Sequence, residues 1–76
     1  MIDQFLERFC RNVRAVRLHH GLSISQMAEI LELTDHLLVL LESGVVTEEM
    51  DIRILEQIFI HFGILPNQLL TEILFE

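Results

Sequence analysis

This chain contains a single cysteine, no lysine and no long hydrophobic segment. Cys10 has no partner for an internal disulfide, which favours a reducing compartment. The longest uninterrupted apolar run covers only residues 37–41, far short of the roughly 20 residues that span a bilayer. No basic segment precedes an apolar stretch at the start, as it does in a secretory signal. We therefore expect a cytoplasmic protein that does not enter the membrane.

Positive charge is scarce and unevenly distributed. The net charge is −7 at pH 7. Residues 1–22 carry four arginines against two acids, whereas residues 23–76 carry ten acids against Arg53 alone. Such an excess of negative charge repels phosphate backbones and favours basic partners. We expect any positive face to be built from the first helix.

The 76 residues, of which 51% are hydrophobic, allow one small domain with its own core, over residues 1–76. Apolar residues at three- and four-residue spacings predict an amphipathic helix over residues 5–18. Further helices are predicted over residues 24–31 and 35–43, from Thr47 to about Phe62, and from Pro66 through Leu74. No segment alternates with the period of a strand. The predicted class is all-α, a compact five-helix domain.

Local signals support these boundaries. Ser23 and Gln26 form a capping-box pattern at the start of the second helix. Thr34 is a suitable N-cap for the third helix, whose acidic first residue suits the helix dipole. Gly44 follows that helix as a terminator. Thr47, followed by two glutamates, has the pattern of another helix start.

Residues 9–70 resemble the Cro/XRE repressor family, which has a lambda-repressor-like fold. The resemblance rests on two patterns. The first runs without a gap through the first three predicted helices and is Val13-x-x-Val16-Arg17-x-x-x-Gly21-Leu22-Ser23-x-x-x-Met27-Ala28-x-x-Leu31-x-Leu33-Thr34-x-x-x-Leu38-x-x-Leu41-Glu42-x-Gly44. The second lies in the fourth predicted helix and is Leu55-x-x-Ile58-x-x-x-Phe62-Gly63-Ile64. It implies that the helices at about 24–31 and 35–43 form a helix-turn-helix motif. It also implies that Ala28 allows these two helices to pack tightly.

The resemblance further implies a structural ion pair between Arg17 and Glu42, at the positions of the family's buried pair. A bidentate arginine–carboxylate contact satisfies both charges and can fix how two helices register. The alternative is two independent surface charges.

For DNA, the resemblance implies that the third helix enters the major groove. The matching reader positions are Asp35, His36, Leu37 and Leu40. Asp35 can accept a hydrogen bond from cytosine, whereas a leucine can only touch a thymine methyl group. Ile24 stands where the family often has a glutamine that anchors backbone and base.

Three arginines of the first helix, Arg8, Arg11 and Arg14, follow each other at three-residue spacing. They are the candidate phosphate contacts for double-stranded DNA. Alternatively, they pair with nearby acids and solubilise the helix.

The third helix is apolar nearly all round, which indicates burial on a second side. Leu37, Val39 and Leu40 are therefore candidate contacts for a homodimer or a protein partner, and Ile73 and Phe75 are candidates near the C-terminus. The alternative is that a small domain exposes scattered aliphatic side chains.

Nothing in the sequence indicates catalysis, a metal site or a cofactor, so we expect the protein not to be an enzyme. His19 and His20 are expected to point to different helix faces, and no histidine pair has the spacing of zinc ligands. Cys10 is expected in the core. No base is positioned to activate a serine.

The sequence thus indicates a small transcriptional regulator of the Cro/XRE type, acting as a homodimer. The alternative is a protein-interaction module on a helix-turn-helix fold, which binds or sequesters a protein such as a repressor and does not bind DNA.

Overall fold

A computed structural model describes residues 4–75, which form five helices and no strand. The helices are α1 (Gln4–His19), α2 (Ile24–Leu31), α3 (Asp35–Glu42), α4 (Arg53–Phe62) and α5 (Pro66–Thr71). The predicted all-α class and the number of helices are confirmed. None of these helices combines the length and the apolar character needed to cross a membrane.

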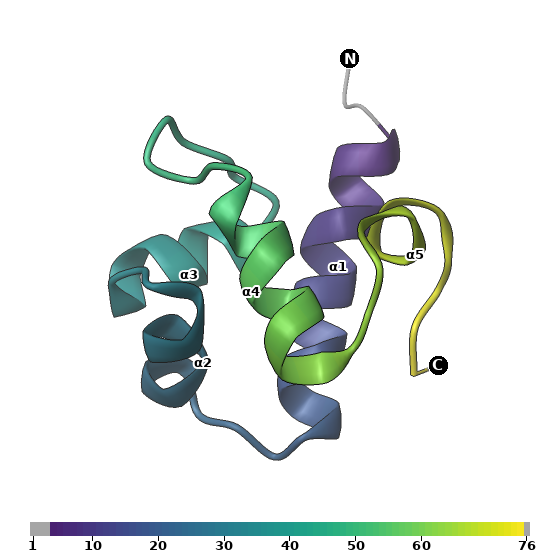
Figure 1. Cartoon of the computed structure of the whole chain (residues 1–76). Coiled ribbons are helices and arrows are strands. Elements are labelled where there is room, and N and C mark those ends of the chain that lie inside the picture. Colours follow the sequence, from purple (N-terminus) through teal and green to yellow (C-terminus); the bar gives the residue numbers. More distant parts are fainter. Residues whose placement is uncertain (1–3, 76) are drawn as a thin grey trace.

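The helices pack around α1 and α4 (Figure 1). α2 packs against α3 and α4, and α3 also contacts α1. On the other side of α1, α5 contacts both α1 and α4. Figure 1 shows α2 and α3 together on one side, with α5 and the C-terminal segment on the other.

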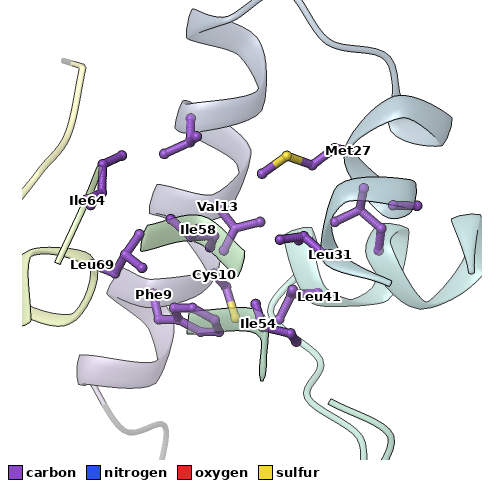
Figure 2. Close-up of a cluster of buried hydrophobic side chains, with 13 residues drawn as sticks. Phe9, Cys10, Val13, Met27, Leu31, Leu41, Ile54, Ile58, Ile64 and Leu69 are labelled. Atoms are coloured by element: carbon purple, nitrogen blue, oxygen red, sulfur yellow. The ribbon is translucent and has the colours of Figure 1, made fainter. Parts of the chain in front are cut away.

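One hydrophobic core joins all five helices. Val13 and Ile58 lie near the middle of the cluster in Figure 2, and Ile64 and Leu69 extend it toward α5. Burying a side chain of this size stabilises a fold by about 1.5–3 kcal/mol. The other members of the cluster are Phe9, Cys10, Val16, Met27, Ala28, Leu31, Leu38, Leu41 and Ile54.

The fourth helix starts at Arg53, so the predicted start at Thr47 is wrong. The backbone N–H of Met50 bonds to the carbonyl of Thr47, which closes a turn, and the Met50 side chain packs against the core. Asp51 then accepts a hydrogen bond from the backbone N–H of Arg53 at 2.9 Å. The helix thus begins just after Asp51, with Ile52 at its N-cap and no side-chain hydrogen bond from that residue.

Two other helix ends differ from the prediction. α3 ends at Glu42, with Ser43 as its C-cap, one residue earlier than expected. α5 ends at Thr71 and does not continue through Leu74. The chain turns away at Glu72, whose backbone is extended. The carbonyl of Glu72 and the backbone N–H of Leu74 bond to the side chain of Asn12 on α1.

The rings of the two adjacent histidines lie against each other and near Phe75. The ring of His19 stacks on Phe75, with centroids 3.8 Å apart. The ring of His20 lies 4.8 Å from that of Phe62 and 5.2 Å from that of His19. The contacts with Phe75 depend on the path of the C-terminal segment. No group of three His, Cys, Asp or Glu side chains in residues 4–75 could hold a metal ion.

Candidate nucleic-acid interface

A complete capping box fixes the start of α2. The hydroxyl of Ser23 accepts a hydrogen bond from the backbone N–H of Gln26 at 3.1 Å, and the backbone N–H of Ser23 donates to Gln26 Oε1 at 2.8 Å. Two of the backbone donors at this helix end are thus satisfied. Ile24, the first residue of α2, lies on the surface beside them, half-buried.

A short turn connects α2 to α3. Glu32 adopts the left-handed conformation with φ of 58°, which reverses the chain after α2. The backbone N–H of Leu33 bonds to the carbonyl of Ala28 at 2.8 Å. Thr34 then caps α3, because its Oγ1 accepts from the backbone N–H of Leu37 at 3.1 Å. Ala28 is buried in this corner, where a small side chain lets the helices approach closely.

The ion pair expected between Arg17 and Glu42 is present and bidentate. Arg17 Nε donates to Glu42 Oε2 at 2.8 Å, and Nη2 donates to Oε1 at 3.0 Å. The two side chains are only 13% and 7% exposed, so solvent screens the pair poorly. The hydrogen bond to Glu42 raises the pKa of Arg17 above its ordinary value. The pair ties the C-terminal end of α3 to α1.

Arg17 also holds the loop that leads into α2. Its Nη1 donates to the backbone carbonyl of Leu22 at 3.1 Å. One guanidinium therefore connects α1, the loop before α2 and the end of α3. Such a planar, multiply bonded group fixes relative orientation better than a point charge does.

The outward side of α3 is mixed in character. Asp35 and His36 at its start are exposed, and Asp35 Oδ2 accepts a 2.5 Å hydrogen bond from the Ser25 hydroxyl. Val39, one turn further on, is 47% exposed. Ser25 is not among the site residues predicted from the sequence. Its link to Asp35 depends on how α2 and α3 pack, and no local pattern signals it.

Leu37 and Leu40 are only half-buried, and Leu38 and Leu41 are in the core. α3 therefore presents Val39, and not a continuous apolar surface, as its most exposed aliphatic side chain. Near the C-terminus, Ile73 is 57% exposed. Phe75 is also exposed, and one of its faces stacks on His19.

Two of the three candidate phosphate-binding arginines lie next to α3. Arg14 lines a surface hollow of about 340 Å³ with Ile24, Val39, Glu42 and Ser43. Arg11 and Arg14 line a neighbouring hollow that also includes Glu42.

The three arginines differ in their surroundings. Arg11 makes a loose, exposed ion pair with Glu7 at 3.6 Å, the kind that contributes little to stability. Arg14 pairs with no carboxylate among residues 4–75. Arg8 is half-buried and lines neither hollow beside α3. Arg11 and Arg14 are therefore the two of these arginines that line the hollows beside α3.

The chain was compared with protein-family models, with curated proteins and with solved structures, and none of these comparisons found a match.

Proposed function

We propose that this chain is a small helix-turn-helix regulator of the Cro/XRE type that binds double-stranded DNA, with α3 toward the major groove. The support is the arrangement of α1, α2 and α3. Two short capped helices meet at a tight corner around Ala28, and the Arg17–Glu42 pair holds them against α1. A motif of this kind presents the second helix to a groove and the flanking segments to the backbone.

The observation that carries the proposal is the place of Arg14 beside Val39 and Ile24. A cation at this position flanks both the start of α2 and the outward side of α3. Phosphate contacts from such a residue fix a protein's register on the duplex, although they carry no sequence information. Arg11, on the same side of α1, supplies a second contact.

Contacts with base edges would come from the start of α3. His36 is exposed and can donate to or accept from a base edge. Asp35 can accept from cytosine, but it also accepts from Ser25 and repels phosphates. Leu40 is half-buried, so little of it remains for a thymine methyl group. We therefore expect weak discrimination between sequences.

A polarisation titration tests the proposal with a fluorescent random-sequence duplex at about 20 mM salt, where charges are little screened. Saturable binding that Arg14→Ala weakens supports the proposal. His36→Ala should leave affinity for the random pool nearly unchanged and should alter the sequences recovered by selection. Binding that Arg14→Ala does not change would place the DNA on a different surface and contradict the proposal.

The second candidate is a protein-interaction module, and the exposed Val39 favours it. An aliphatic side chain at the centre of α3, between Asp35 and Glu42, suits a protein surface better than a DNA groove. The low-salt titration separates the two functions, because a module of this kind shows no DNA binding even there. A binding partner would then be lost on Val39→Asp.

A further inference from the structure

One side-chain hydrogen bond joins the start of α2 to the start of α3 on the surface proposed for DNA. The hydroxyl of Ser25, the second residue of α2, donates to Oδ2 of Asp35, the first residue of α3, at 2.5 Å. Both side chains are exposed. Neither helix needs this bond as a cap, because Ser23 and Thr34 cap the two helices. The bond is therefore free to serve another purpose.

The Ser25–Asp35 pair lies next to the hollow that contains Arg14. Ile24, the residue before Ser25, lines this hollow. Val39 lines it too, and it stands four residues after Asp35 on the same face of α3. In a helix-turn-helix motif, phosphate contacts fix the position of the protein, and the first residues of the second helix meet the base edges. With Arg14 as the phosphate contact, Asp35 occupies the place of a base contact.

The bond to Ser25 leaves one carboxylate oxygen of Asp35 available. Only Oδ2 accepts from Ser25, and the Asp35 carboxylate makes no other hydrogen bond and no ion pair within residues 4–75. An ionised carboxylate accepts hydrogen bonds and cannot donate them. The Ser25 hydroxyl, whose proton is directed at Asp35, also has only lone pairs left. The pair thus presents acceptors alone, and the bond restricts the rotation that the carboxylate would otherwise lose on binding.

A group that only accepts hydrogen bonds distinguishes the bases in the major groove. Cytosine presents an amino donor there, whereas guanine presents two acceptors and thymine an acceptor and a methyl group. Adenine presents an amino donor next to the acceptor N7, which repels a carboxylate. Cytosine is therefore the base whose edge matches Asp35 best.

We propose that Asp35, held in place by Ser25, selects cytosine at one position of a bound duplex. This inference rests on the proposed binding of DNA through α3. Asp35 is the residue that touches the base, and Ser25 is a positioning residue that acts through it. Because the contact is a single hydrogen bond from a group that also repels phosphates, the preference for cytosine over the next base is only about fivefold.

The test begins with selection from a pool of random duplexes by the full chain at about 20 mM salt. Selection with Asp35→Asn should replace cytosine by adenine at one position, because an asparagine amide can bond both N6 and N7 of adenine. Polarisation titrations then compare four duplexes that differ only at that position. The unmodified chain should bind the cytosine duplex about fivefold more tightly than the next best.

Variants of Ser25 test its positioning role on the same four duplexes. Ser25→Ala should reduce the preference for cytosine to within about twofold, and Ser25→Thr, which keeps a hydroxyl, should retain it. Neither variant should shift the urea midpoint, because the bond is exposed and both helix caps remain. Glu29→Gln is the matched control for Asp35→Asn, since it also removes one negative charge at an exposed position. It should leave the base preference unchanged.

The outcomes separate this inference from the proposed function. If no duplex binds, the proposed function is wrong and the inference falls with it. If duplexes bind and Asp35→Asn leaves the base preference unchanged, Asp35 does not read cytosine, although DNA binding stands. If Asp35→Asn changes the preference and Ser25→Ala does not reduce it, the positioning role of Ser25 is wrong.

Discussion

The carboxamide oxygen of Asn12 accepts a hydrogen bond from the backbone N–H of Leu74 at 3.1 Å, across 62 residues of sequence. The Nδ2 of the same side chain donates to the carbonyls of Leu69 at 2.8 Å and Glu72 at 2.7 Å. Asn12 is 2% exposed and is the only buried polar residue among those that the structure describes. Its side chain therefore fastens the end of α5 and the following segment to α1.

We predict that Asn12→Ala destabilises the protein by about 1–3 kcal/mol, because the backbone groups of Leu69, Glu72 and Leu74 lose a buried partner. Urea unfolding followed by circular dichroism measures the change. Asn67→Ala is the matched control, since Asn67 is an exposed asparagine on α5. A loss for Asn12→Ala no larger than for this control would show that the three bonds do not stabilise the fold.

Glu42→Ala should cost about 3–5 kcal/mol, because it leaves the guanidinium of Arg17 uncompensated in a mostly buried position. Glu29→Ala removes an exposed glutamate from α2 and should change the free energy of unfolding by less than about 0.5 kcal/mol. Chemical denaturation of the two variants compares them directly. An equally small effect of both would mean that the bidentate pair does not hold α3 against α1.

Stability should fall at alkaline pH because of Cys10. Burial raises the pKa of its thiol above the ordinary value. Above about pH 8.5 the unfolded thiol loses its proton while the folded one keeps it, so the free energy of unfolding decreases until the folded thiol also ionises. The chain has no lysine or tyrosine, so Cys10 is the only side chain titrating between about pH 8 and 11.

Urea unfolding between about pH 7 and pH 10, a range that spans the ordinary thiol pKa, measures this slope. Cys10→Ala should remove most of it, whatever the variant does to stability at neutral pH. An identical decline in both proteins would assign the slope to another group.

If the protein is a dimer that binds DNA, its contact must leave α3 free. We therefore predict that Ile73, which is exposed in the C-terminal segment, contributes to the contact and Val39 does not. Ile73→Asp should weaken dimerisation by about tenfold, roughly the effect of losing a partly buried isoleucine. Val39→Asp should leave it unchanged. Sedimentation velocity distinguishes the two, and a monomer at high protein concentration refutes self-association altogether.

The parts of the fold that depend on neighbouring residues could be predicted from the sequence. Ser23 with Gln26 and Thr34 mark helix starts by side chains that bond within three residues, so α2 and the start of α3 follow from local chemistry. The start of α4 could not be chosen by the same means, because Thr47 and Asp51 are both residue types suited to a helix start. Thr47 instead accepts a turn hydrogen bond from Met50, whose side chain packs against the core.

The contacts that join distant segments were not predictable locally. No local pattern distinguishes Asn12 from the other residues of the predicted first helix, because its hydrogen-bond partners lie 57 to 62 residues away in the sequence. The same holds for the stacking of His19 on Phe75. Arg17 and Glu42 could be paired beforehand only through the resemblance to a family, since 25 residues separate them.

If DNA binds beside α3 through Arg11 and Arg14, as we propose, the affinity for a duplex should depend on salt in a characteristic way. With two or three neutralised phosphates, the log–log slope should lie between about −2 and −3. Arg14→Ala should weaken binding to all sequences alike and reduce the slope by about one. Arg53→Ala should change neither the affinity nor the slope, because Arg53 lies at the start of α4 and pairs with Asp51. Binding of DNA beside α3 is contradicted if no duplex binds at about 20 mM salt, or if Arg53→Ala weakens binding as much as Arg14→Ala does.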